Sequence, residues 1–265
     1  MIEPLDRPLQ RLYDWLMMIP NCAFRFFPVL MACLAAGLFS SGCQTRPTAA
    51  AGAVPPEKSI RPGVNTEYLK PNLEVSQWVE RFEREGREIY NQRQQIIKAA
   101  RIRRGLAVAD IGAGTGLFTP LLADATGPRG KVYAVDIVKD FLALIEKRAA
   151  VAGLRNVRTV LCTERSVELA KNSVDLAFIC DVYHHFEYPH SSLASLHRAL
   201  RPGGELVLVE FKRVPGQSSD WVLNHVRAGQ EVFTAEIEAA GFKKVQEIDL
   251  LKENYILRFR KVQKL

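Results

Sequence analysis

The chain has 265 residues, of which 48% are hydrophobic and 25% are charged, a composition that excludes extensive disorder and supports a sizeable folded core. Its length suits one large α/β domain with extra segments, or two small domains. The formal net charge is only +7 and the basic residues are scattered, which argues against a nucleic-acid partner.

The first segment, residues 1–43, has the layout of a secretory signal or membrane anchor. An apolar stretch, residues 26–39, follows Arg25 and precedes the small residues Ser40, Ser41 and Gly42 before Cys43. It is shorter than the roughly 20 apolar residues that a membrane span needs. The small residues before Cys43 resemble the lipobox of bacterial lipoproteins, although Ser40 stands where that family prefers a branched aliphatic residue.

This segment predicts a membrane-associated or exported protein of the bacterial envelope, lipidated at Cys43 after cleavage. Two alternatives remain open: an uncleaved anchor, or a true start at Met17 or Met18, which would leave the protein cytoplasmic. Acidic residues ahead of the apolar stretch favour the late start. Residues 44–72, which are rich in Ala, Pro and Thr in their first half, are predicted to be a flexible linker.

From residue 73 to residue 265 the sequence alternates helical and strand patterns. A polar stretch with apolar residues at helical spacing covers residues 74–101, and Gly86 is expected to divide it. The other predicted helices start near residue 117, cover residues 139–152 and 191–200, and end at residues 235–240. The predicted strands cover residues 106–111, 131–137, 157–162, 174–180, 205–211, 244–250 and 255–260.

This order predicts an α/β fold with a Rossmann-like parallel sheet and helices on both faces. Too few residues separate the last two strands for a crossover helix, so they are expected to form an antiparallel C-terminal hairpin. Ligands of such sheets bind beyond the carboxyl ends of the strands, at the point where the strand order reverses. Functional residues are therefore expected directly after the parallel strands.

The strongest motif is the glycine-rich loop Asp110-Ile-Gly-Ala-Gly-Thr-Gly116, which follows the first predicted strand. Glycines allow the backbone to turn tightly and to approach a ligand closely. Asp136 ends the next strand, where its carboxylate is placed to bind the two hydroxyls of a ribose. A glycine loop followed by such an acid predicts a nucleoside-binding site, which several enzyme classes share.

Two details favour a ligand without phosphate. The spacing is GxGxG rather than the GxGxxG of dinucleotide-binding enzymes, and Asp110 stands where it would repel a pyrophosphate. In these features the chain resembles the class I S-adenosylmethionine-dependent methyltransferases, whose cofactor carries an ammonium group instead. The stretches YAVDI at residues 133–137 and LRPGG at residues 200–204 extend the resemblance, which is nearest to the small-molecule methyltransferases of the ubiquinone and menaquinone type.

The resemblance implies a set of cofactor-binding residues. Asp110 would lie near the methionine amino group, Asp136 would hold the ribose hydroxyls, and Ile137 would pack on the adenine. Thr163 or Glu164 would meet the adenine amino group, in a region that departs from the usual family pattern. The full set of implied cofactor-binding residues is Asp110, Gly112, Ala113, Gly114, Thr115, Gly116, Asp136, Ile137, Thr163, Glu164 and Asp181.

The segment Asp181-Val-Tyr-His-His-Phe186 follows the fourth strand, and in this family it borders the transferred methyl group. Methyl transfer from a sulfonium is a direct displacement, so catalysis consists chiefly of alignment. A base is needed only where the acceptor must lose a proton, and His184 or His185 suits that role. Tyr183 is a further catalytic candidate because aromatic rings attract cations. The alternative for the two histidines is that one satisfies backbone groups and the other is solvated, and the alternative for Tyr183 is core packing.

Further residues are expected around the acceptor and over the cofactor. Phe82, Arg87 and Tyr90 are candidates for a lid. No CxxC pair or Cys/His cluster with metal-ligand spacing occurs in the sequence, so no metal site is predicted. The candidates for the acceptor pocket are Glu210, Phe211, Arg213, Ser219, Asp220, Trp221 and His225.

The predicted function is methyl transfer from S-adenosylmethionine to a small organic acceptor, which a membrane location would make lipid-soluble. A nicotinamide-dependent oxidoreductase is the second hypothesis, and the absent GxGxxG spacing argues against it. A non-catalytic module that binds S-adenosylmethionine or another nucleoside is the third, because fold does not fix function. The sequence specifies neither the acceptor nor the oligomeric state.

Overall fold

The computed structural model describes residues 57–262, which belong to one compact unit. It contains seven strands, joined mostly by helices as the alternating sequence pattern predicts. The strands are β1 (Ala107–Ile111), β2 (Lys131–Asp136), β3 (Val157–Leu161), β4 (Val174–Cys180), β5 (Leu200–Phe211), β6 (Phe242–Ile248) and β7 (Asn254–Lys261). The helices are α2 (Val75–Phe82), α3 (Glu88–Asn91), α4 (Arg93–Ala99), α5 (Thr119–Thr126), α6 (Lys139–Val151), α7 (Pro189–Ala199), α8 (Asp220–His225) and α9 (Gln230–Ala239), with a 3-10 turn η1 (Tyr183–His185).

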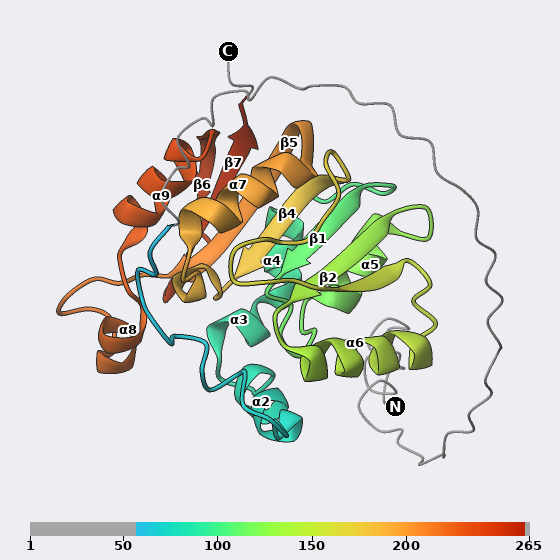
Figure 1. Cartoon of the computed structure of the whole chain (residues 1–265), viewed down its shortest axis with the longest axis horizontal. Helices are drawn as coiled ribbons and strands as arrows, with labels where there is room; N and C mark the ends of the chain where they lie inside the picture. Colours follow the sequence, from blue (N-terminus) through green and yellow to red (C-terminus); the bar gives the residue numbers. More distant parts are fainter. Residues whose placement is uncertain (1–56, 263–265) are drawn as a thin grey trace, which may run out of the picture. The chain divides into compact units, whose positions relative to one another are not determined.

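The strands form a single sheet in the order β3-β2-β1-β4-β5-β7-β6 (Figure 1). The first five strands pair in parallel, and β7 pairs antiparallel with both β5 and β6. The predicted fold class and the antiparallel hairpin are therefore confirmed. The strand order reverses between β1 and β4, so the loops after these two strands flank the crevice in which ligands of such sheets bind.

The direction of each crossover places the helices on both faces of the sheet. The β1-α5-β2-α6-β3 steps run toward one edge and the β4-α7-β5 step runs toward the other, so right-handed connections put α5 and α6 on one face and α7 on the opposite face. Helix α4 packs against α5, and α7 packs against α9. Strand β1 is buried along its whole length, as its sequence predicts, because all its residues but Asp110 are apolar.

The described fold begins earlier than predicted. Residues 57–72 were assigned to the linker, but they lie along the domain (Figure 1). The Glu57 carboxylate accepts hydrogen bonds from the backbone N–H groups of His190 and Ser191 at the start of α7, and Ile60 N donates to Glu187 O. These bonds fix the segment because they satisfy helix N–H groups that have no partner within the helix.

Two local predictions also differ from the structure. Helix α8 was not anticipated, because its six residues are too few to show a helical period. The strand predicted from residue 205 begins at Leu200 in the structure, and the added residues lie at an irregularity of its pairing with β4, where Gly203 has φ +73°. No described helix is long and apolar enough to cross a membrane. The predicted signal, its lipidated Cys43 and most of the predicted linker lie outside the described residues.

Candidate functional site

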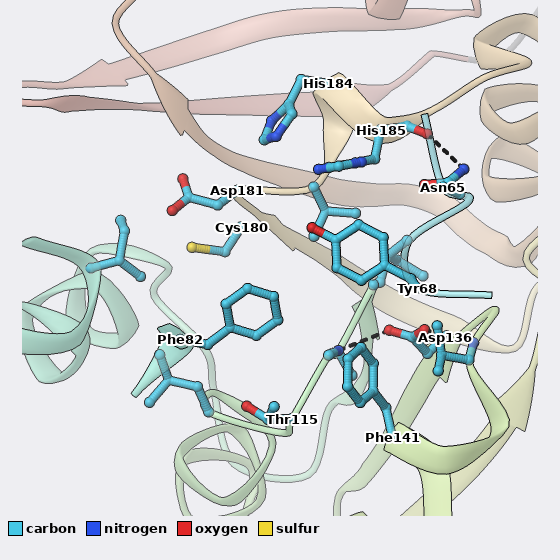
Figure 2. A pocket seen from close by; sticks show the side chains of 18 of the residues that line it. Asn65, Tyr68, Phe82, Thr115, Asp136, Phe141, Cys180, Asp181, His184 and His185 are labelled. Atoms are coloured by element: carbon cyan, nitrogen blue, oxygen red, sulfur yellow. Dashed lines mark hydrogen bonds between the residues drawn. The ribbon is translucent and has the colours of Figure 1, made fainter. Parts of the chain in front are cut away.

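A cavity of about 690 Å³ opens at the carboxyl ends of β1, β2 and β4. Figure 2 shows Thr115 and Asp136 at one end of it and His184 and His185 at the other, with aromatic rings between them. The cavity therefore brings the glycine-rich loop and the histidine pair of the sequence into one space. Its aromatic lining consists of Tyr68, Phe82, Phe118, Phe141, Phe186, Phe211 and Trp221.

The three glycines of the loop have different tasks. A side chain at Gly112 would place its Cβ 2.3 Å from Val182 Cγ1, and one at Gly116 would place it 2.8 Å from Ile145 Cγ1. Both glycines are thus required by packing within the protein. Gly116 does not line the cavity, so its predicted contact with the cofactor is not found. Gly114, with φ +55°, does line the cavity, as do Ala113 and Thr115.

Asp136 organises the loop and the start of α6. One carboxylate oxygen accepts a hydrogen bond from Gly114 N and the other from Val138 N, both at 2.8 Å. Burial raises the pKa of this carboxyl to about 6, although these backbone N–H groups act to lower it. Each oxygen can accept a second hydrogen bond, so the group retains the capacity to bind a pair of ribose hydroxyls.

Asp110 lies deeper, at the end of β1, and lines the same cavity. Its Oδ2 accepts a hydrogen bond from the Thr119 hydroxyl at 2.7 Å. Burial raises its pKa to about 7, with a smaller contribution from the negative charge of Asp136. The buried hydroxyl of Thr115 has no hydrogen-bond partner among the residues that the structure describes. A buried carboxylate beside an unpartnered hydroxyl fits a ligand that carries a cation and further polar groups.

The predicted adenine end is also present. Ile137, Thr163 and Glu164 all line the cavity, together with Cys162. The Thr163 hydroxyl accepts the backbone N–H groups of Arg165 and Ser166, which fixes the turn after β3. Asn65 Nδ2 lies 3.5 Å from Glu164 Oε1. Glu164 therefore has spare acceptor capacity in the cavity, whereas the Thr163 oxygen mainly stabilises its own turn.

Asp181 lines the cavity, but its carboxylate is held by other side chains. Its two oxygens accept hydrogen bonds from Arg87 Nη2 and Asn254 Nδ2, each at 2.6 Å. Its backbone is in the left-handed region, with φ +51°, an unusual conformation for a residue other than glycine. Burial raises its pKa to about 6, while the Arg87 guanidinium acts to lower it. Asp181 thus connects Arg87, which directly precedes α3 in the predicted lid, to Asn254 at the start of β7.

His184 has a fixed ring orientation. Its Nδ1 lies 2.8 Å from Oε2 of Glu210, a residue that is completely buried, and its backbone N donates to the same oxygen. The other Glu210 oxygen accepts Phe211 N, so the carboxylate is firmly placed at the end of β5. An ionised carboxylate accepts only, which assigns the imidazole proton to Nδ1 and leaves the Nε2 lone pair available.

His185 and His225 stand beside His184 in the same cavity. Their Nε2 atoms are 3.2 Å apart, and Trp221 stacks on His225 with ring centroids 4.5 Å apart. Burial lowers the pKa of His185 to about 2 and that of His225 to about 4, and the neighbouring His184 reinforces both shifts. Both rings are therefore uncharged at neutral pH and are weak bases compared with an ordinary histidine.

The prediction for Tyr183 is wrong. Its side chain is completely buried outside the cavity, and its hydroxyl donates to Glu236 Oε2 at 2.8 Å. Glu236 also pairs with Arg227, and the Tyr183 ring packs edge-on against Phe233 of α9. Burial raises the pKa of the phenol further above its ordinary value. The side chain is a core residue because η1 turns it toward α9, while His184 and His185 line the cavity.

The predicted acceptor residues divide into two groups. Phe211, Ser219, Trp221 and His225 line the cavity. Glu210, Arg213 and Asp220 do not. The Arg213 guanidinium instead donates to two backbone carbonyls of the α8 region, which it holds in place.

The lid is only partly as predicted. Phe82 and Arg87 line the cavity, but Tyr90 does not. Sequence reasoning missed Asn65 and Tyr68, which line the cavity from residues assigned to the linker. Asn65 Nδ2 donates to the His185 backbone oxygen, and the Tyr68 ring meets the His185 ring edge-on. No periodic pattern marks this irregular segment.

Residues 109–208 match the model of a family described as a methyltransferase domain. The chain is 30% identical over 118 residues to the ubiquinone/menaquinone biosynthesis C-methyltransferase UbiE of Burkholderia cenocepacia, and 31% identical over the same length to that of Burkholderia mallei. Each alignment covers 44% of this chain and 48% of the relative. The aligned part thus spans about half the length of these curated relatives.

Solved structures share the fold. A SAM-dependent methyltransferase from Aquifex aeolicus superposes with a TM-score of 0.64 at 23% identity, over 71% of this chain and 99% of that one. The [4+2]-cyclase SpnF gives a TM-score of 0.57 at 16% identity, over 65% and 82%. The family match thus covers residues 109–208, and these solved structures share the fold of the described residues. They also show that the fold carries more than one reaction.

Proposed function

We propose that this class I, S-adenosylmethionine-dependent methyltransferase domain transfers a methyl group to a small, lipid-soluble acceptor of the quinol type. The observation that carries the proposal is the continuity of the cavity. Its lining joins the acidic, glycine-rich end at Asp110 and Asp136 to the histidine-rich, aromatic end at His184 and Trp221. A donor and an acceptor that occupy the two ends would therefore meet between them.

The residues of the first end fit S-adenosylmethionine, which supplies an electrophilic methyl group on a sulfonium when it is bound. Asp136 would hold the ribose hydroxyls, and Asp110 with Thr115 would hold the methionine end. The Phe82 and Tyr68 rings lie between the two ends in Figure 2, where their negative faces favour a cation over a neutral group. The chain thus binds and orients, which is the main requirement of a direct displacement.

The second end suits an apolar aromatic acceptor with a dissociable hydroxyl. Phe186, Phe211 and Trp221 offer ring surface, and Trp221 remains 45% exposed beside His225. His184, oriented by Glu210, is the chain's best-placed group to take a proton from the acceptor. The relatives named for ubiquinone and menaquinone biosynthesis support an acceptor of quinol type, whose aromatic carbon becomes nucleophilic when a hydroxyl is deprotonated.

The proposal is tested by incubating the full-length chain with S-adenosylmethionine and a panel of reduced demethylated quinols that carry isoprenoid tails of different lengths. We expect S-adenosylhomocysteine and singly methylated product to form in equal amounts, as measured by mass spectrometry. NADH with the oxidised quinones is the parallel assay for the oxidoreductase alternative. Cofactor binding without turnover on any acceptor would instead favour the non-catalytic alternative.

The proposal extends to location, because a lipid-soluble acceptor is concentrated in membranes. Attachment through the N-terminal segment would bring the cavity to such an acceptor. Export would separate the enzyme from the cytosol, where its cofactor is made, so an anchor that leaves the domain in the cytosol agrees best with the proposed reaction. Recovery of the protein entirely in the soluble fraction after gentle lysis would contradict membrane attachment.

Cofactor affinity is expected to depend on pH. Burial raises the pKa of Asp110 to about 7 and that of Asp136 to about 6, and their ionised forms are the ones that attract an ammonium and accept ribose hydroxyls. Affinity should therefore fall as pH is lowered from about 7.5 to 5, by about tenfold per unit for each carboxylate that must be ionised. Calorimetry across this range measures it. A pH-independent affinity would mean that neither carboxylate must be ionised for binding.

The same shifts have the opposite consequence for the cofactor-free protein. A carboxyl whose folded pKa is raised contributes stability at low pH, and that contribution is lost as pH rises through the folded value. The unfolding temperature without cofactor should therefore decline between about pH 4 and pH 7 as far as these two groups determine it. Saturating cofactor should reduce the decline, because it binds the ionised forms.

A further inference from the structure

Three of the five histidines of the chain converge at the acceptor end of the cavity. His184 and His185 come from η1 after β4, and His225 ends α8 about forty residues later in the sequence. One ring nitrogen of each lies within 4.8 Å of the corresponding atom of the other two. The cluster is not a generic polar surface, because all three residues line the cavity.

The spacing of two of the three rings matches that of zinc ligands. A zinc ion with Zn–N distances of 2.0–2.1 Å in tetrahedral geometry separates its nitrogen ligands by roughly 3.3–3.4 Å. The Nε2 atoms of His185 and His225 are 3.2 Å apart. Between two neutral imidazoles this contact requires one ring to donate its proton to the other. A cation between them would instead use both lone pairs.

Glu210 supplies the outer contact that metal-bound histidines usually have. Its completely buried carboxylate accepts the Nδ1 proton of His184, which leaves Nε2 of that ring as the ligating atom. His185 Nδ1 is buried without a hydrogen-bond partner, so the hydrogen bonding of this cluster is incomplete within the described chain. When Nε2 of His185 binds an ion, Nδ1 carries the ring proton, so His185 lacks the outer contact that Glu210 gives to His184.

The charges around the cluster both favour and oppose a cation. Glu210 is negative and completely buried beside His184, whereas Arg61 and Arg81 contribute positive charge near His185 and His225. The Arg61 guanidinium donates to the His225 backbone oxygen and so is directed at the helix end rather than at the ring nitrogens.

We propose that His184, His185 and His225 form a three-histidine site for a borderline divalent cation, with Zn²⁺ as the preferred ion. Three imidazoles and no thiolate suit zinc, cobalt, nickel or copper(II). They do not suit magnesium or calcium, which prefer oxygen ligands. Three protein ligands leave a fourth position open, and this position faces the cavity. A hydroxyl or carbonyl oxygen of the acceptor is the chemical group that it would take.

The site is tested on the full-length chain, free of any histidine tag and treated with a chelator, by titration with Zn²⁺ in a calorimeter. We expect one ion per chain at micromolar affinity or better. Titration with Co²⁺ should give the intense visible absorption of a four-coordinate cobalt site. Addition of a quinol or a simple catechol should change that absorption, because it occupies the open position.

His225→Gln and His185→Gln are the decisive variants, and His190→Gln is the matched control, since His190 is exposed at the start of α7. We expect a hundredfold or greater loss of Zn²⁺ affinity in the first two and no change in the control. Unchanged affinity in both cluster variants, or no binding to the wild type, would overturn the proposal. Folding is checked by S-adenosylmethionine affinity, and neither metal readout requires methyl transfer.

Discussion

Asp136→Ala is expected to weaken S-adenosylmethionine binding by about a hundredfold or more while the chain stays folded. The wild-type carboxylate offers one further acceptor site on each oxygen to the ribose, and a hydrogen bond to a charged group contributes about 1.5–3 kcal/mol. Loss of two such bonds corresponds to at least two powers of ten in the dissociation constant. Calorimetry on the full-length chain measures the change directly.

The same substitution removes the bonds to Gly114 N and Val138 N, so part of the loss could come from a loosened loop. Asp136→Asn separates the two effects, because its amide oxygen still accepts one backbone N–H but carries no charge. We expect an intermediate affinity for this variant. Asp140→Ala, an exposed acid in the first turn of α6, is the control and should bind normally. Normal binding by Asp136→Ala would remove the cofactor assignment of this end of the cavity.

His184→Gln is expected to lower kcat by about 10²–10⁴ with little change in cofactor affinity. The ring serves the acceptor end whether it takes the proton itself or holds a cation that binds the acceptor oxygen. Glu210→Gln should lower kcat by about ten- to a hundredfold, because an amide NH₂ facing Nδ1 favours the tautomer with its proton on Nε2. Glu210 is a positioning residue whether His184 takes the proton or holds a cation.

The measurements are kcat, the KM for the acceptor and the pH dependence of both, alongside calorimetry with S-adenosylmethionine. A merely structural role of Glu210 would lower the unfolding temperature without altering the pH profile of kcat. His190→Gln should behave as wild type. Full kcat in His184→Gln would show that the acceptor reacts without losing a proton to this ring, and the reaction would then depend on alignment alone.

The fold by itself leaves the reaction open. A [4+2]-cyclase and a SAM-dependent methyltransferase share this architecture with the chain at comparable superposition. What favours methyl transfer here is the donor end, where Asp110 and Asp136 line the cavity beside Gly114. What would specify the acceptor is the histidine-rich end, and Trp221 and His225 there come from a helix that the sequence pattern did not reveal.

The sequence alone determined the sheet, its hairpin and the cofactor end of the site. Asp110, Gly114 and Asp136 each follow or end a parallel strand, and the carboxyl ends of parallel strands meet at one edge. Their positions along the chain therefore imply their proximity in space. The strands themselves were predictable because buried β-strands are short, nearly continuous apolar runs.

Only the tertiary structure decided the acceptor end. Adjacent side chains of η1 have different surroundings. Tyr183 packs in the core against Phe233 of α9, whereas His184 and His185 line the cavity. His225 and Glu210 reach the same site from α8 and β5, and Asn65 reaches it from a segment without periodicity. Loop and short-helix conformations depend on long-range packing rather than on local pattern, so no spacing rule could bring these side chains together in advance.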